Sequence, residues 1–137
     1  MVGRHSISDH ESLVRAYLRA IERGEVVGHE SDWYVDNAVQ IELPNRLIPS
    51  GATRDLAALK LAGERGKAIV ETQSYEVLDM IESGDKVAVH AIFRATLNMD
   101  VLGLPKGQEM VAHFAMFFEL RDGRITRHYS YDCFEPW

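Results

Sequence analysis

The chain has 137 residues, of which 46% are hydrophobic and 26% charged, and this balance predicts a single soluble globular domain over residues 1–137. Its formal net charge of −6 argues against a nucleic-acid partner, because such a partner selects for a basic surface. The single cysteine excludes an internal disulfide. No apolar run approaches the roughly 18 residues of a membrane span, and no signal peptide is apparent, so we expect a cytoplasmic protein without a membrane partner.

The N-terminal residues predict a well-marked helix. Ser8 and Glu11 have the spacing of a capping box, in which two side chains satisfy free amides at the helix start. An apolar stripe that includes Tyr17 follows at helical spacing, and Gly24 is placed to end the helix.

Two further helices and one strand are expected before residue 70. The stretch "EVVGHESDWY" indicates a short helix, and "NAVQIEL" (37–43) alternates as a strand does. The stretch "TRDLAALKLAGERG" predicts a third helix, with Thr53 as its cap and Leu56, Ala57 and Leu59 facing inward.

The remainder changes to strand periodicity. Four long strands are predicted from "VETQSYEVLDMIES", "KVAVHAIFRATLN", "EMVAHFAMFFEL" and "RITRHYSYDCF", with hairpin turns at Ser83-Gly84-Asp85 and at Asp122-Gly123. Helices that precede a meander of antiparallel strands predict an α+β fold with the helices on one face of a bent sheet.

The final strand places polar groups among aromatic ones. Alternation puts His128, Ser130 and Asp132 on one face. The opposite face carries Arg127, Tyr129, Tyr131 and Cys133. A carboxylate among aromatic rings needs a partner, a proton or a chemical role, and Asp132 is therefore a candidate. Cys133 is out of phase with that face, and we expect it to be buried packing.

The turn at Asp122-Gly123 leaves two registers open. A two-residue turn sets His113 opposite Asp132. A three-residue loop with Gly123 as a bulge gives instead an apolar row, which we favour, of Ala112, Phe114, Met116 and Phe118.

Several motifs in this order resemble one superfamily. "LVRAYLRAIERGE", "DNAVQIELPNRLIPSG" and "FFELRDGRI" followed by "YSYD" are similar to segments of the nuclear transport factor 2-like fold, which includes ketosteroid isomerase and the SnoaL-like polyketide cyclases. The resemblance implies three helices packed on a curved antiparallel sheet that encloses an apolar pocket. It also implies a homodimer through the outer sheet face, a small apolar ligand and no cofactor.

The resemblance implies roles for individual residues. Tyr17 resembles the tyrosine that holds the enolate oxygen in ketosteroid isomerase, and Tyr34 resembles a tyrosine that supports it. Glu42 has the spacing of the isomerase's general base. These enzymes move a proton with a carboxylate while hydrogen-bond donors hold the oxyanion.

The sequence also departs from each relative. The position of the isomerase's second donor is Met116, and the SnoaL-like base position is Ser130, with Asp132 one pleat further along. The pair that limonene-epoxide hydrolases need corresponds to Ala91 and Phe93. Our hypothesis is therefore that Glu42 and Asp132 divide the base and acid roles, with Tyr17 as donor and His128 polarising a substrate oxygen.

Each candidate has a structural alternative. Tyr17 can be core with a satisfied hydroxyl, Glu42 a solvated rim residue and His128 a structural histidine. Asp132 can cap a turn or pair with Arg46 or Arg94. His90, His113 and His128 on successive strands lack short-spaced ligand pairs, so no metal site is predicted. The residues expected to contact substrate are Tyr34, Trp33, Phe93, Phe114, Met116, Phe118 and Ser130.

Three functions follow from these patterns. The first is a cofactor-free isomerase, cyclase or dehydratase acting on a small apolar oxygenated molecule. The second is a protein that binds such a molecule without turnover, and the third is a dimerisation module. Carboxylates that project into an open cavity favour the enzyme.

Overall fold

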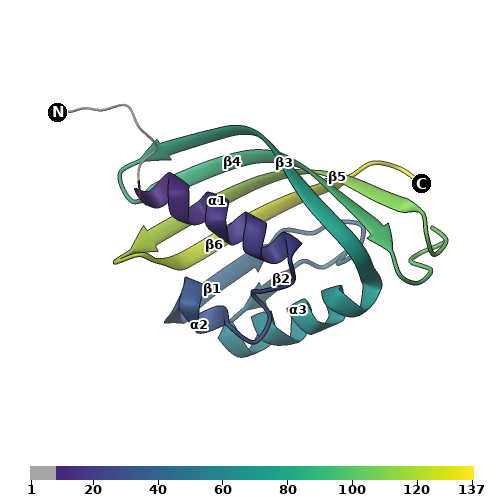
Figure 1. Ribbon diagram of the computed structural model, residues 1–137, viewed down its shortest axis with the longest axis horizontal. Coiled ribbons are helices and arrows are strands. Elements are labelled where there is room, and N and C mark those ends of the chain that lie inside the picture. The colour runs from purple at the N-terminus through teal and green to yellow at the C-terminus, as the bar shows by residue number, and fades with distance from the viewer. Residues whose placement is uncertain (1–8) are drawn as a thin grey trace.

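The structure is a computed structural model that describes residues 9–137. Within these residues, three helices and one six-stranded sheet form an α+β arrangement, which can be followed in Figure 1. The predicted α+β class is therefore confirmed. The capping box at Ser8 lies outside the described residues. The helices are α1 (Asp9–Glu22), α2 (Glu30–Trp33) and α3 (Leu56–Ile69), and the strands are β1 (Tyr34–Glu42), β2 (Ala52–Arg54), β3 (Val70–Ser83), β4 (Lys86–Leu97), β5 (Glu109–Arg121) and β6 (Arg124–Phe134).

The strands form one sheet in the order β2-β1-β6-β5-β4-β3. Neighbours from β3 to β6 are antiparallel, as are β1 and β2. The expectation of a fully antiparallel sheet is wrong at one place, because β1 runs parallel to β6. The alternation of a strand shows which side chains share a face but carries no information about the direction of a neighbour distant in sequence.

Gly24 ends α1 as the sequence predicts. Its backbone has φ of 69°, a left-handed conformation that a side chain would strain. The amide of Gly24 donates to Ile21 at 2.9 Å, and the amide of Glu25 donates to Ala20 at 2.9 Å. These two bonds form a Schellman motif, which satisfies carbonyls at the end of the helix.

The start of α3 differs from the prediction. Thr53 does not cap the helix, since it belongs to the short strand β2. The cap is Asp55, whose carboxylate accepts a hydrogen bond from the amide of Ala58 at 2.9 Å. None of the residues of α3 is buried, so the expected inward row of Leu56, Ala57 and Leu59 is at most half-buried.

Two glycine-to-alanine substitutions are expected to act in opposite directions. Gly24→Ala should lower the free energy of unfolding by about 1 kcal/mol, because alanine is strained in the left-handed region. Gly66→Ala should raise it by about 1 kcal/mol, because alanine favours a helix interior. An added Cβ at Gly66 meets no atom within 4 Å. Urea denaturation of both variants checks the prediction, and equal signs would contradict it.

The turn between β5 and β6 consists of Asp122 and Gly123, both with positive φ (52° and 78°). This conformation belongs to a two-residue hairpin turn, so the favoured three-residue loop is wrong. The pairing of β5 with β6 nevertheless shifts by one residue just beyond this turn. Glu119 pairs with Arg127 and Leu120 with Ile125, which leaves Thr126 as a bulge.

The bulge restores the register that the three-residue loop was expected to give. Asp132 pairs with Phe114, and His113 pairs with Cys133 on the other face. The favoured row is therefore confirmed, and its members Ala112, Phe114, Met116 and Phe118 are all buried. Cys133 is exposed, so the expectation of buried packing for it is wrong.

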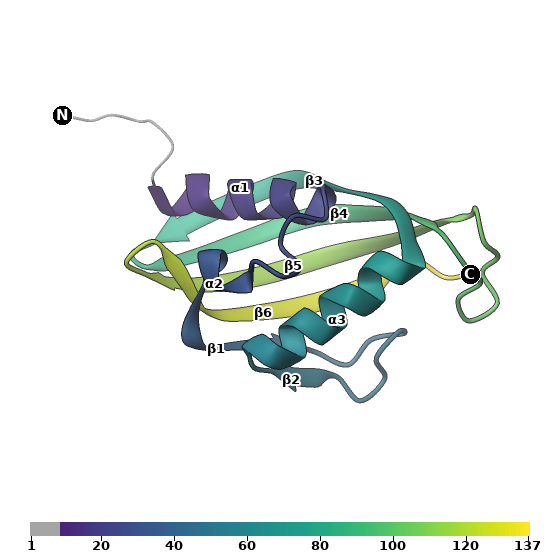
Figure 2. The same cartoon turned by 60° about the horizontal axis from the view of Figure 1, so that its bottom comes forward.

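The helices lie on the concave face of the sheet (Figure 2). Buried residues alternate along β4 and β5, and these inward side chains pack beneath α1 to form the core. Because α3 buries none of its residues and lies over the β1–β2 edge, the concave face is less tightly filled at that end than beneath α1.

Candidate functional site

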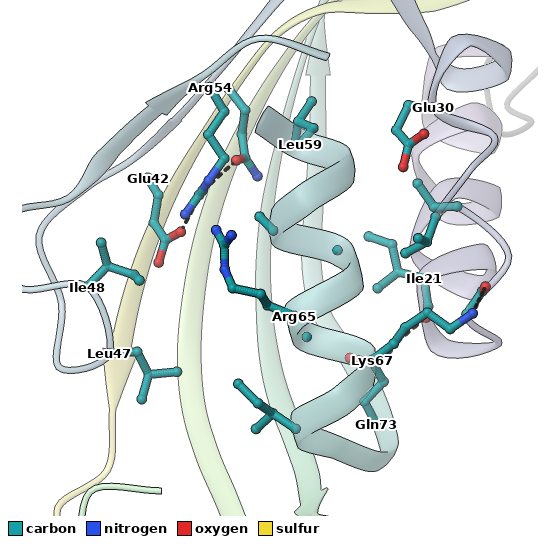
Figure 3. Close-up of a pocket in the computed structure, with 18 of the residues that line it drawn as sticks. Ile21, Glu30, Glu42, Leu47, Ile48, Arg54, Leu59, Arg65, Lys67 and Gln73 are labelled. Carbon is teal, nitrogen blue, oxygen red and sulfur yellow. Dashed lines mark hydrogen bonds and ion pairs between the residues drawn. The ribbon is translucent and has the colours of Figure 1, made fainter. Parts of the chain in front are cut away.

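A cavity of about 580 Å³ lies between α1, α3 and the β1–β2 edge (Figure 3). This volume is within the range of about 300–1,000 Å³ typical of small-molecule sites. Its polar lining includes Tyr17, Tyr34, Gln40, Glu42 and Arg54. Its apolar lining includes Ile21, Leu47, Ile48, Leu59, Val101 and Leu102. The structure thus brings three predicted residues, Tyr17, Tyr34 and Glu42, to one cavity.

A buried hydroxyl network joins Tyr17, Tyr34 and His128. The two tyrosine hydroxyls lie 2.6 Å apart, and the Tyr34 hydroxyl lies 3.2 Å from Nδ1 of His128. Burial raises the pKa of Tyr17 to about 12; the Tyr34 hydrogen bond opposes this shift and the Glu30 charge adds to it. Burial likewise raises the pKa of Tyr34 well above its ordinary value. Both hydroxyls are therefore protonated at neutral pH.

His128 is neutral in this environment. Burial lowers the pKa of its imidazole to about 3, because an imidazolium would have little solvation there. Its ring stacks on Phe118 at a centroid distance of 4.2 Å. Within the described part of the chain, its Nε2 atom is buried without a hydrogen-bond partner. His128 therefore acts in the site only as a neutral hydrogen-bonding group.

Tyr34→Phe tests the hydroxyl network. The substitution leaves the Tyr17 hydroxyl and Nδ1 of His128 without this shared partner, and we expect the free energy of unfolding to fall by about 2 kcal/mol. Tyr131→Phe is the matched control, because Tyr131 is 45% exposed on the outer face. Its expected change is below about 0.5 kcal/mol. Equal losses in the two variants, measured by urea denaturation, would show that the network does not stabilise the fold.

Asp132 combines partial burial with a raised pKa, and its predicted acid/base role stays a prediction. It is partly buried on the concave face, and its carboxyl oxygen accepts a short hydrogen bond from the Ser130 hydroxyl. Burial raises the pKa of Asp132 to about 6; the Ser130 hydrogen bond opposes this shift, Glu42 adds to it and Arg54 opposes it. A carboxyl that titrates near neutral pH exchanges protons readily in either direction.

Neither Arg46 nor Arg94 pairs with Asp132. Arg94 binds Glu76 at 2.9 Å on the outer face, and the guanidinium of Arg46 lies 4.0 Å above the ring of Trp137. The structural alternative based on these two arginines is therefore wrong.

Glu42 is held by two neighbours. Its Oε1 accepts a hydrogen bond from Nη1 of Arg54 at 2.8 Å, and its Oε2 accepts one from the Asn45 side chain at 2.7 Å. Arg54 also donates to Gln40 at 2.8 Å. Both carboxylate oxygens of Glu42 are therefore engaged within the protein, and its role as a base stays a prediction.

The other predicted contact residues lie beside the cavity and do not line it. Phe93 and Phe114 stack at 5.0 Å, and Tyr75 packs against both. Trp33 packs on Tyr17 at 5.7 Å. Met116, Phe118 and Ser130 are buried in the same concave layer, so substrate contact by these residues stays a prediction.

Sequence reasoning missed Arg54, Gln40 and Arg65. Arg54 belongs to a three-residue strand, which is too short to show alternation, and its partners lie 12 and 14 residues earlier. Gln40 lines the cavity, and it pairs with His128 where β1 runs beside β6. Arg65 gave no distinctive signal, because its helix segment "LAGERGKA" also carries the charged residues Glu64 and Lys67.

Two loops at the cavity mouth are joined by Trp137. Its indole nitrogen donates to the carbonyl of Leu102 at 3.1 Å, and its ring makes a cation–π contact with the Arg46 guanidinium. The loops that contain Leu102 and Arg46 both contribute to the cavity wall. Trp137 therefore fixes the position of one loop relative to the other.

The outer sheet face is partly apolar. Phe117 and Tyr131 are 49% and 45% exposed and contact each other edge to face at 6.0 Å. The expected homodimer through this face stays a prediction. Over residues 9–137, no helix has the length and apolar character needed to cross a membrane, and no three His, Cys, Asp or Glu side chains gather as metal ligands.

The family model for the SnoaL-like domain matches residues 14–128. The chain belongs to the SnoaL-like family. This assignment places it in the nuclear transport factor 2-like superfamily and confirms the resemblance found in its motifs. No curated protein matches the chain.

Solved structures show that this SnoaL-like protein shares its fold with proteins of low identity. IdmH of Streptomyces antibioticus, "a putative polyketide cyclase", is 21% identical with a TM-score of 0.76, covering 91% of this chain and 92% of its own. AclR of Streptomyces galilaeus, "a putative hydroxylase", is 20% identical with a TM-score of 0.74, covering 93% and 90%. A SnoaL-like polyketide cyclase of Agrobacterium tumefaciens is 16% identical with a TM-score of 0.65, covering 90% and 91%.

Proposed function

We propose that this SnoaL-like protein is a cofactor-independent acid/base enzyme that moves protons on a small, apolar, oxygenated molecule, as in cyclisation or isomerisation. The observation that supports this function best is the partly buried carboxyl of Asp132, whose pKa is raised to about 6. It lies on the same concave face as the hydroxyl network. A base of this pKa, beside protonated hydroxyls, suits proton abstraction next to a carbonyl.

The proposed step uses one base and one donor. The Asp132 carboxylate takes a proton from the carbon beside a carbonyl, and the electron pair of that C–H bond forms an enolate. The Tyr17 hydroxyl donates a hydrogen bond to the enolate oxygen. The protonated Asp132 then returns its proton to a carbon or oxygen of the product, and Glu42 holds Arg54 in place.

The direction of the hydroxyl network determines whether Tyr17 can donate. If Nδ1 of His128 carries the proton, it donates to Tyr34, Tyr34 donates to Tyr17, and the Tyr17 proton is left for a ligand. In the opposite direction Tyr17 donates to Tyr34 and Tyr34 donates to Nδ1 of His128. The imidazole proton is then on Nε2, which is buried without an acceptor within the described residues. A buried donor without a partner is rare, which favours the first direction. Nitrogen NMR of His128 distinguishes the two tautomers, and we expect the Nδ1–H form.

The test is hydrogen–deuterium exchange of β-tetralone, an apolar ketone with acidic protons beside its carbonyl. In D2O, the protein should accelerate loss of those proton signals in NMR spectra, and naphthol, which mimics an enolate oxygen, should inhibit it. Acceleration equal to that of an unrelated protein would overturn the proposed enzyme.

A second candidate is a protein that binds such molecules without turnover. Two observations favour it. Glu42 is held by Arg54 and Asn45, and Asp132 does not line the cavity. Binding of naphthol without tetralone exchange would support this alternative.

A further inference from the structure

We propose that the cavity selects ligands that carry a carboxylate, and that Arg65 and Arg54 together bind this group. The inference rests on the proposed function for the use of the cavity as a ligand site, and it adds the chemical class of the ligand. It is carried by the placement of charged groups around the cavity.

Two guanidinium groups belong to the cavity wall and only one is neutralised there. Arg54, which is 8% exposed, pairs with Glu42. Arg65 extends from α3 toward the Glu42–Arg54 pair in Figure 3 and has no ion pair or hydrogen bond within the described residues. Arg65 therefore contributes an uncompensated positive charge to this side of the cavity.

Arg54 also has unused donors. Both of its hydrogen bonds to Gln40 and Glu42 use Nη1, and no bond within residues 9–137 engages its Nη2 or Nε. A guanidinium has five N–H donors, arranged to match the two oxygens of a carboxylate. Arg54 thus offers nearly buried N–H donors beside the uncompensated charge of Arg65.

The remaining charged lining groups do not cancel this excess. Glu30 is 9% exposed, and its two carboxylate oxygens share the single N–H of the Gly28 amide. Lys67 donates to the carbonyl of Gly24 at 3.4 Å. The lining as a whole has three cations and two carboxylates, in a protein with a net charge of −6. Asp132, whose carboxyl interacts with the charges of Glu42 and Arg54, lies outside this lining. A local positive charge on an acidic protein favours an anionic group of a ligand over a neutral one.

Calorimetric titration with naphthalene carboxylate and its neutral isostere, naphthalene carboxamide, tests the inference. At neutral pH and low salt, we expect the carboxylate to bind at least about tenfold more tightly to the unmodified protein, as charge-assisted bonds allow. Arg65→Gln should reduce that preference at least about threefold, and Arg65→Lys should retain part of it. Lys60→Gln, on the exposed side of the same helix, is the matched control and should keep the full preference.

The outcomes separate this inference from the proposed enzyme. Equal binding of carboxylate and carboxamide, or an unchanged preference in Arg65→Gln, overturns the inference even if tetralone exchange is catalysed. A preference that depends on Arg65, without any tetralone exchange, supports the inference while overturning the enzyme. Urea denaturation of Arg65→Gln verifies its folding, which we expect to be unaffected because Arg65 is exposed.

Discussion

Asp132→Asn is expected to slow tetralone exchange by about a hundredfold or more, because a positioned general base contributes at least this factor. In the unmodified protein the rate should rise with pH and level off above pH 6, since the pKa of the Asp132 carboxyl is raised to about 6 and only its ionised form accepts a proton. The residual rate of the variant should lack this titration. Proton NMR between pH 4 and 8 measures both rates.

Asp132→Asn should raise the free energy of unfolding at neutral pH, although it slows exchange. Because the pKa of Asp132 is higher in the folded protein than its ordinary value of 3.8, the folded state holds its proton more tightly than the unfolded state. The free energy of unfolding therefore falls as pH rises from about 4 to 6, and this loss persists above pH 6. Asparagine has no such titration, so above pH 6 we expect the variant to be more stable than the unmodified protein.

Two controls identify the carboxylate responsible. Asp36→Asn changes an exposed aspartate of β1 and should leave both the exchange rate and its pH dependence unchanged. Glu42→Gln separates the two candidate carboxylates, and a loss as large as that of Asp132→Asn would assign a catalytic role to Glu42. If the exchange rate of Asp132→Asn still rises with pH and levels off above pH 6, Asp132 is not the base.

Arg54→Met is expected to lower the free energy of unfolding by about 3 kcal/mol. The Arg54 and Glu42 side chains are only 9% and 15% exposed, and methionine leaves the Glu42 charge buried without its partner. Adding Glu42→Gln to Arg54→Met should recover a large part of the loss, since the unpaired charge is then removed. Urea denaturation of the single and double variants measures the effect.

A matched ion pair elsewhere provides the control. Arg94 and Glu76 form a similar contact at 2.9 Å, but their side chains are 39% and 55% exposed. Arg94→Met should therefore cost less than about 1 kcal/mol, as exposed pairs do. If Arg94→Met and Arg54→Met are equally destabilising, burial of the Glu42–Arg54 pair is not the cause.

The sequence was most informative where local patterns determine the structure. The glycine that ends α1 and the alternation that puts Asp132 and His128 on one face follow from local backbone geometry. The family resemblance added the pairing of Tyr17 with Tyr34, whose hydroxyls are 2.6 Å apart. These features require only spacing or similarity along the chain.

Features that depend on contacts between distant segments were not predictable in this way. The parallel direction of β1 and β6 and the bulge at Thr126 depend on how whole strands pack. The pairing of Glu42 with Arg54 depends on β2, whose three residues give no periodic signal. The state of Glu42 therefore required the structure, although its position in the sequence had made it a candidate.

The parallel β1–β6 pair also has a consequence for the order of folding. Tyr34 and His128 are separated by 94 residues, and their hydrogen bond forms only when β6 has docked against β1. Local hairpins such as β3–β4 close short loops and lose little chain entropy, whereas this contact closes almost the whole domain. We therefore expect the hydroxyl network to be among the last contacts to form, so that partly folded molecules have most of the sheet without a functional site.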